Sequence, residues 1–265
     1  MNANNEYIQA LRDMVTCGDE VSPRQQPTFE VTGLCVVFDM QRPIITIPER
    51  ELDYKFMVAE AYWILNGKAD LDSYVRKNLE KYSDDGKTMF GAYGPPIKEQ
   101  LDYVVDVLLK DSDTRQACLT IWTRNPRVSK DIPCTLAMQF MLRQGLLHCN
   151  VFMRSQDVWL GLPYDLFTFS MVSLMVIAKM HEIKELAELP ANILLGDLKI
   201  FAGSRHLYHR NMETSEDLCV SWTDGDIFDI NTLRIIKPDY LMCALDYARN
   251  AQGDEVLSRI KERLC

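Results

Sequence analysis

The chain has 265 residues, of which 47% are hydrophobic and 25% charged, the balance of a globular protein that can bury a substantial core. Its formal net charge of −9 argues against a protein that coats nucleic acid through a basic face, although a few arginines in one cleft would suffice for a small anionic ligand. The first residues lack the layout of a signal peptide, and proline, aspartate and hydroxyl residues interrupt the longest apolar run. We therefore expect a cytoplasmic protein without membrane contact or direct nucleic-acid binding.

The N-terminal part of the chain alternates between helical and extended patterns. Residues 5–16 predict an amphipathic helix, and residues 21–47 are rich in β-branched residues and predict strands. Residues 51–66 carry apolar side chains at helical spacing and stop at Gly67, a suitable residue after a helix C-terminus.

The remainder of the chain continues in the same manner. No repeat, low-complexity tract or Gly/Ser/Pro linker divides it, so we expect residues 1–265 to form a single α+β domain. Further strands are predicted at 117–123, 135–143 and 148–155 and in LKIFAG, with HLYHRN leading into a helix, and further helices at 98–110, 164–180, 240–249 and 254–263.

The eight cysteines are scattered, with no CxxC pair and no His/Cys spacing typical of a metal site. In a reducing compartment they are expected to be free thiols, mostly buried as small hydrophobic side chains. We therefore predict no metal centre, and a nucleophilic role for any one cysteine depends on its neighbourhood.

Three clusters of reactive side chains stand out from this background. Taken one at a time, each has an ordinary structural explanation: a core thiol, an ion pair, an acid favoured by the positive end of a helix dipole, or a polar pair under a loop. The clusters are KDIPCT with Cys134, MRSQDVWLGLPYD with Arg154, Asp157 and Asp165, and GSRHLYHRN with His206 and Tyr208.

Taken together, the clusters resemble the thymidylate synthase family in order and spacing. The similarity is close from Asp113 to Asn211 and is supported upstream by AEAYWILNG and FGAYG. It implies the thymidylate synthase fold: a twisted mixed β-sheet with a long buried central helix, flanking helices and a homodimer that packs sheet to sheet.

Residue by residue, the resemblance implies covalent catalysis. Cys134 would add to carbon 6 of a pyrimidine ring and make carbon 5 nucleophilic, and nearby arginines would lower the pKa of its thiol. Glu60 would manage proton transfers through ordered water, and Tyr93 would assist near the reacting carbon.

The resemblance also implies how the nucleotide and the co-substrate, 5,10-methylenetetrahydrofolate, are held. Arginines and a serine would bind the 5′-phosphate, one arginine reaching across from the partner subunit of an obligate homodimer. A histidine and a tyrosine would bind the sugar 3′-hydroxyl, and an aspartate would face the pterin. The phosphate residues are Arg24, Arg154, Ser155 and, from the partner subunit, Arg115. The sugar residues are His206 and Tyr208, and the pterin residue is Asp157.

Asp165 is the departure that bears on the base. Family members that act on dUMP carry asparagine here, and one amide satisfies the N–H and carbonyl of uracil. Cytosine presents an amino donor beside an unprotonated ring nitrogen. A carboxyl group accepts from the amino group and, when protonated, donates to that nitrogen, which also helps as the thiolate adds. Asp165 therefore predicts a preference for dCMP.

Further departures bear on the group transferred. Residues 78–89 contain no tryptophan where the synthases have two, so a wetter wall would let water capture the methylene carbon and yield a hydroxymethyl group. Thr135 replaces a histidine and Gln116 a second arginine, the sequence ends ERLC, and GSRH replaces the usual GDxH. These features resemble the phage-type deoxycytidylate hydroxymethylases.

The expected reaction is dCMP plus methylenetetrahydrofolate plus water to 5-hydroxymethyl-dCMP and tetrahydrofolate. Four alternatives stay open at this point. They are a dCMP methylase, a hydroxymethylase of the ribonucleotide CMP, a dUMP-using thymidylate synthase, and a non-catalytic nucleotide-binding protein on the same fold.

Overall fold

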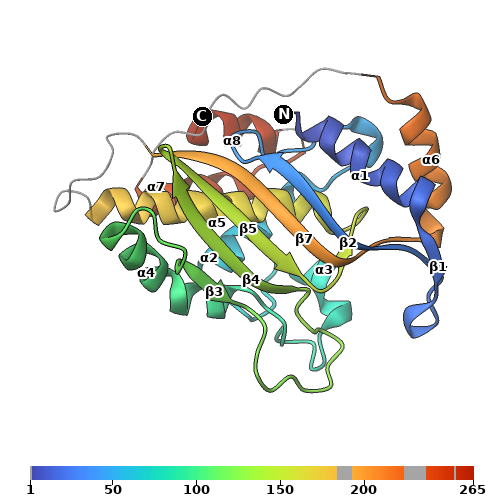
Figure 1. The fold of residues 1–265 in the computed structure, drawn as a ribbon, viewed down its shortest axis with the longest axis horizontal. Helices are drawn as coiled ribbons and strands as arrows, with labels where there is room; N and C mark the ends of the chain where they lie inside the picture. Colours follow the sequence, from blue (N-terminus) through green and yellow to red (C-terminus); the bar gives the residue numbers. More distant parts are fainter. Residues whose placement is uncertain (1, 184–192, 224–236, 254) are drawn as a thin grey trace.

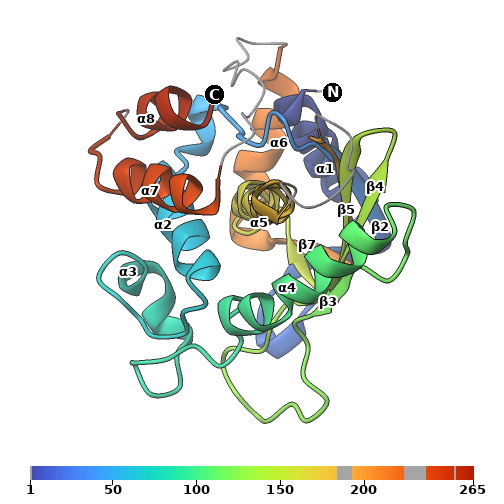
Figure 2. The same ribbon diagram turned by 90° about the vertical axis from the view of Figure 1, so that its left-hand side faces the viewer.

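A computed structural model describes residues 2–183, 193–223, 237–253 and 255–265. These residues form one mixed β-sheet with helices gathered on one of its faces (Figures 1 and 2). The predicted α+β class and mixed sheet are confirmed.

The sheet is organised around β7, its longest strand. Strand β7 runs antiparallel to β2 and parallel to β5 and to the short β6. The order across the sheet is β1 (Asp19–Val21), β2 (Thr28–Asp39), β7 (Leu194–Tyr208), β5 (Leu146–Met153), β4 (Thr135–Arg143) and β3 (Cys118–Thr120), with β6 (Gln156–Asp157) paired to β7.

Two predicted strand regions differ from the observed strands. The region 21–47 contains one long strand, β2, because Pro23–Gln25 forms a turn of 3-10 helix (η1) with Arg24 at a positive φ of 54°. LKIFAG and HLY belong to a single strand, because β7 pairs continuously with β2 from Asp197 to Tyr208 apart from one unpaired position opposite Gly33.

The predicted helices are all present. The first begins where the Asn2 side chain accepts a hydrogen bond from the N–H of Asn4, and α2 begins where Asp53 accepts one from Phe56. The α-helices are α1 (Ala3–Cys17), α2 (Tyr54–Leu65), α3 (Arg76–Leu79), α4 (Gly94–Lys110), α5 (Leu162–Ile183), α6 (Met212–Ser221), α7 (Pro238–Arg249) and α8 (Glu255–Leu264), with 3-10 turns η2 (Pro48–Arg50), η3 (Glu80–Tyr82) and η5 (His209–Asn211).

Helix α5 is the predicted central helix, and it lies between the sheet and helices α2 and α7 (Figure 2). Two of its polar residues are compatible with burial, because Ser170 and Ser173 donate to carbonyl oxygens one turn earlier, at 2.7 and 2.8 Å. Among the described helices, α5 alone has the length and composition to cross a membrane, contrary to the expectation from its interruptions. However, 78% of its most apolar stretch is buried inside the protein, so α5 is a core helix.

The opposite face of the sheet carries an apolar patch. Phe152 on β5 and Phe201 on β7 are register partners and stack with ring centroids 5.3 Å apart. They remain 40% and 37% exposed, and the exposed Cys35 on β2 pairs with Phe201. Exposed aromatic side chains in the middle of a sheet are typical of a surface that is covered by a partner.

Candidate active site

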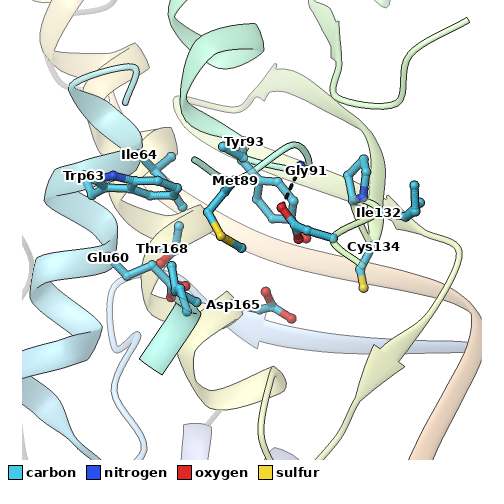
Figure 3. Close-up of a pocket in the computed structure, with 14 residues that line it drawn as sticks. Glu60, Trp63, Ile64, Met89, Gly91, Tyr93, Ile132, Cys134, Asp165 and Thr168 are labelled. Carbon is cyan, nitrogen blue, oxygen red and sulfur yellow. Dashed lines mark hydrogen bonds between the residues drawn. The ribbon is translucent and has the colours of Figure 1, made fainter. Parts of the chain in front are cut away.

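A cavity of about 180 Å³ opens where the first turn of α5, helix α2 and the loops before α4 and β4 meet (Figure 3). It brings together four side chains that are predicted to act on the pyrimidine ring and come from positions up to 105 residues apart: Glu60, Tyr93, Cys134 and Asp165. The lining residues are Glu60, Trp63, Ile64, Leu79, Met89, Gly91, Ala92, Tyr93, Asp131, Ile132, Pro133, Cys134, Asp165 and Thr168.

The loop that carries Cys134 is held in place by Arg154. The backbone N–H of Arg154 donates to the carbonyl of Cys134 at 2.9 Å. Its guanidinium donates to the carbonyls of Pro133 and Ile132, at 3.0 and 2.9 Å, and Nη2 lies 3.8 Å from the Cys134 sulfur. The loop also requires Gly91, because a Cβ there would lie 2.8 Å from the nitrogen of Pro133. The predicted nucleophile therefore faces the cavity with a cation beside it.

Burial outweighs the expected effect of the arginines on the pKa of the Cys134 thiol. Arg154 and Arg24 do act in that direction, but burial is the larger effect, and the pKa of Cys134 is raised. The carboxylates of Asp165 and Asp131 add to the rise. The thiol of the unliganded chain is therefore protonated near neutral pH, and forming the thiolate requires a change in its surroundings.

Burial has the same effect on the acids of the cavity. It raises the pKa of Asp165 to about 7, against a hydrogen bond from Gln156 that lowers it, and the charge of Asp157 raises it further. Burial, reinforced by Asp165, raises the pKa of Glu60 to about 8. Near neutral pH the cavity therefore holds carboxyl groups that can donate a proton as well as accept one.

Tyr93 lines the same cavity as these acids and the predicted nucleophile. Its hydroxyl accepts a hydrogen bond from the backbone N–H of Thr135, the residue after Cys134, at 3.3 Å. Its ring stacks on Phe169 of α5 with centroids 6.4 Å apart. Burial raises the pKa of Tyr93, so its hydroxyl keeps its proton.

The predicted sugar and cofactor residues gather beside the cavity, where β6 pairs with β7. Register places Asp157 next to His206, and the Ser155 hydroxyl lies 3.4 Å from Nδ1 of His206. His206 contacts Tyr208 edge to face, with ring centroids 5.3 Å apart, as their spacing on one strand predicts. The Asp157 carboxylate accepts two backbone N–H groups, from Trp159 and Leu160, both at 2.8 Å.

The remaining two arginines differ in position. Arg24 is exposed, and its charge acts on both Cys134 and His206, so it lies on the site side of the molecule. Arg115 is exposed beside β3, and its guanidinium makes no hydrogen bond within the part of the chain that the structure describes. The predicted site residues other than Arg115 therefore either line the cavity or are linked by contacts or charge to residues around it.

Several lining residues were not anticipated from the sequence. Thr168 is 3% exposed, and its hydroxyl has no hydrogen-bond partner among the described residues. The available signal was its position three residues after Asp165, which places both side chains on one face of α5. Leu79 and Met89 come from the tryptophan-free segment and form part of the wall. Within the described ranges no group of three or more His, Cys, Asp or Glu side chains is arranged to hold a metal ion.

Comparison with known families agrees with this arrangement. The profile of the thymidylate synthase family matches residues 5–220, which include every element that builds the cavity. Members of this family are folate-dependent transferases that deliver a one-carbon unit from methylenetetrahydrofolate to carbon 5 of a pyrimidine nucleotide. The chain belongs to the thymidylate synthase family.

Proposed function

We propose that the protein converts dCMP, methylenetetrahydrofolate and water to 5-hydroxymethyl-dCMP and tetrahydrofolate. The observation that carries this proposal is the state of Asp165, a carboxyl group in the cavity of Cys134 whose pKa is raised to about 7. A neutral carboxyl group offers one donor and one acceptor side by side.

That pair of groups matches cytosine. The protonated oxygen donates to the unprotonated ring nitrogen, and the other oxygen accepts from the exocyclic amino group. With the proton on that same oxygen, uracil would place its ring N–H against the donor and its carbonyl against the acceptor, a mismatch at both points. In a desolvated site a mismatch of this kind costs about 10²-fold or more in selectivity.

The chemistry follows from the groups that surround the base. Cys134 loses its proton and adds to carbon 6, and donation from Asp165 to the ring nitrogen draws off the charge that develops. Methylenetetrahydrofolate supplies the one-carbon unit that becomes bonded to carbon 5. Glu60 transfers the proton that is removed from carbon 5. Its pKa of about 8 is suited to proton transfer near neutral pH. The bond between the one-carbon unit and the folate nitrogen then breaks, and tetrahydrofolate leaves while Cys134 is still bonded to carbon 6.

Water then adds to the one-carbon unit and loses a proton, which completes the hydroxymethyl group, and Cys134 leaves carbon 6, which restores the double bond of the ring. Two features of the cavity support this outcome over a methyl product. Leu79 and Met89 line the wall and the 78–89 segment supplies no indole to it, which favours access by water. The unpartnered Thr168 hydroxyl lines the same cavity as Glu60, so the two side chains are suited to hold a water molecule between them.

The remaining roles are assigned to residues beside the cavity. Arg24, Arg154 and Ser155 bind the 5′-phosphate, His206 and Tyr208 bind the sugar, and Asp157 faces the pterin. The apolar wall of Trp63 and Ile64 fits the flat face of that ring. In this proposal residues 1–265 act as one domain.

The site is completed by a second subunit. The exposed stack of Phe152 and Phe201 supports a homodimer that packs sheet to sheet, because apolar side chains of this size gain most by burial. Arg115 of each chain then contributes to the phosphate site of its partner, in agreement with its exposed position.

The test is turnover of dCMP, CMP and dUMP, each with methylenetetrahydrofolate, followed by mass and by absorbance. We expect dCMP to be used fastest and to gain CH₂O. A gain of CH₂ together with the absorbance rise of dihydrofolate would identify a methylase, and faster use of dUMP would overturn the selector role of Asp165. Comparable use of CMP would extend the substrate range to ribonucleotides.

A further inference from the structure

Gln156 and Arg205 form a buried polar pair next to the base cavity, and the chemistry above leaves it unused. Strand register places Gln156 of β6 beside Arg205 of β7. Each residue is only 1% exposed. Nε of Arg205 donates to Oε1 of Gln156 at 3.0 Å, and the Gln156 side chain hydrogen-bonds Asp165. A continuous chain of contacts therefore connects Arg205 to the carboxyl group that faces the base.

Arg205 is costly to keep in this position. Burial lowers its pKa to about 10, so it is still a cation at neutral pH. Within the described residues Arg205 forms no salt bridge, and Nη2 has no hydrogen-bond partner. A buried cation of this kind destabilises a fold unless it is paired. The charge of Asp13 offsets part of this cost, but burial still dominates, so stability alone does not explain Arg205.

The hydrogen-bonding capacity of the two groups explains what the pair does. A guanidinium group has only donors, whereas an amide has one acceptor end and one donor end. Gln156 can therefore present only Oε1 to Arg205, which turns its NH₂ group away. That group donates to the sulfur of Met153 at 3.4 Å, and its second N–H is available to Asp165, whose pKa is lowered by a hydrogen bond from Gln156. Without Arg205 the amide could turn over and present its oxygen to Asp165.

The orientation of this amide decides where Asp165 carries its proton. A carboxyl oxygen that accepts an N–H from Gln156 is a poor place for a proton, so the proton lies on the other oxygen. We infer that Arg205 and Gln156 are positioning residues for base selection: Arg205 locks the Gln156 amide, which keeps the Asp165 proton on the oxygen that faces the ring nitrogen of cytosine. This inference rests on the proposed function.

Other ionisable groups also surround Asp165, and none of them fixes which of its two oxygens carries the proton. It faces Glu60 of α2, Tyr93 before α4, Cys134 before β4 and Asp157 of β6. Burial and the charge of Asp157 raise the pKa of Asp165, whereas the hydrogen bond from Gln156 lowers it. Loss of that hydrogen bond should therefore move the titration of Asp165 to higher pH.

The experiment is a double-mutant cycle on the full-length enzyme, with kcat/KM for dCMP and for dUMP measured across pH. We expect Gln156→Met to lower the dCMP-to-dUMP ratio about tenfold and to raise the pH at which use of dCMP declines. Arg205→Met should lower the ratio in the same direction, and it should add nothing in the Gln156→Met background, because it acts only through that amide. Arg205→Lys, which keeps a donor, should retain most of the ratio.

Arg50→Met is the matched control. Arg50 is a second buried arginine, 7% exposed, which donates to the Tyr7 hydroxyl and the Trp159 carbonyl. Its loss should reduce stability without moving the ratio. If a single variant fails to fold, the double variant carries the test, because it leaves neither polar group unpaired.

An unchanged ratio in the Gln156→Met and double variants, or independent and additive losses in the cycle, would overturn the inference. Failure of the wild-type enzyme to use dCMP would instead overturn the proposed function, so the two failures are distinguishable.

Discussion

The two ends of the candidate active site differ in whether their ionisable side chains are buried or exposed. In the base cavity, burial raises the pKa of Glu60 and Asp165 to about 8 and 7, so protons can be held and moved near neutral pH. At the end that is proposed to bind the phosphate, Arg24 and Arg154 are exposed. The buried end is suited to discrimination and proton transfer, and the exposed end to anchoring. Substitutions at the two ends should therefore have different kinetic signatures.

The largest effect should come from Cys134→Ser in the cavity. We expect kcat to fall about 10⁴-fold or more, because a hydroxyl does not replace the thiolate as nucleophile, while dCMP binding is retained through the phosphate end. Rapid-quench or steady-state assays together with calorimetric titration of dCMP measure the two quantities. Near wild-type turnover would refute the nucleophile assignment, and intact mass after incubation with a fluorinated nucleotide and the folate should show the covalent adduct only in wild type.

Asp165→Asn should change which base is used. We expect the ratio of kcat/KM for dCMP to that for dUMP to fall about 10³-fold, because the amide matches uracil and cannot supply the proton that cytosine needs. Competition between the two nucleotides in one reaction gives the ratio directly. A preference that stays with dCMP would show that another group reads the base.

The phosphate end should behave as a shared site between subunits. Arg115→Ala should lower kcat/KM for dCMP about 10²-fold, mostly through KM, because a charge-assisted contact to phosphate is lost. Mixing this variant with inactive Cys134→Ser should restore about a quarter of wild-type activity, since half of the dimers are mixed and each holds one intact site.

Recovery in this mixing experiment depends on exchange of subunits, so the two chains should be co-expressed and the mixed dimer purified. A mixed dimer without activity would place Arg115 outside the partner's site.

Phe152→Asp, on the apolar patch of the sheet, should give a monomer with low activity, and its mass in solution can be measured by ultracentrifugation.

Thr168→Val should have a smaller effect, confined to the cavity. We expect kcat to fall about tenfold with little change in KM, because loss of one hydrogen bond to the reacting water affects the chemical step more than binding. Thr168→Ser, which keeps the hydroxyl, is the control. Equal losses in both variants would indicate that Thr168 acts by packing.

Removal of the cavity acids should stabilise the protein above neutral pH. Asp165 and Glu60 have folded-state pKa values above their ordinary ones, so their contribution to stability is complete below about pH 4 and is lost as the pH rises through 7 and 8. We expect Asp165→Asn and Glu60→Gln each to raise the free energy of unfolding by about 1–2 kcal/mol at about pH 8.5 and by less at about pH 5. Urea denaturation at both values checks this, and an equal effect at both would contradict it.

The sequence predicted the elements whose signal is local. The apolar run after Tyr164 predicts α5, although the helix begins earlier, at Leu162. The region 21–47 was predicted too broadly, because propensity does not show where pairing with β7 stops. The motif residues around Cys134 and Asp165 were predicted because their order along the chain is itself the signal, and the fold places them at one cavity.

Properties that depend on packing could not be predicted in this way. The pKa of Cys134 was expected to be lowered by arginines, but the burial that raises it is invisible in the sequence. Gln156 and Arg205 gave no local signal, since a buried polar residue acquires its role from the strand or helix packed against it. The sequence therefore gave a signal for residues proposed to touch substrate, but not for Gln156 and Arg205, which are proposed to position them.

A crystal structure of the enzyme with dCMP and a folate bound is the most direct test of this account. It should show the Asp165 carboxyl within hydrogen-bonding distance of both the ring nitrogen and the amino group of cytosine, with the Cys134 sulfur within bonding range of carbon 6. A carboxyl group turned away from the base, or a sulfur out of reach of the ring, would contradict it.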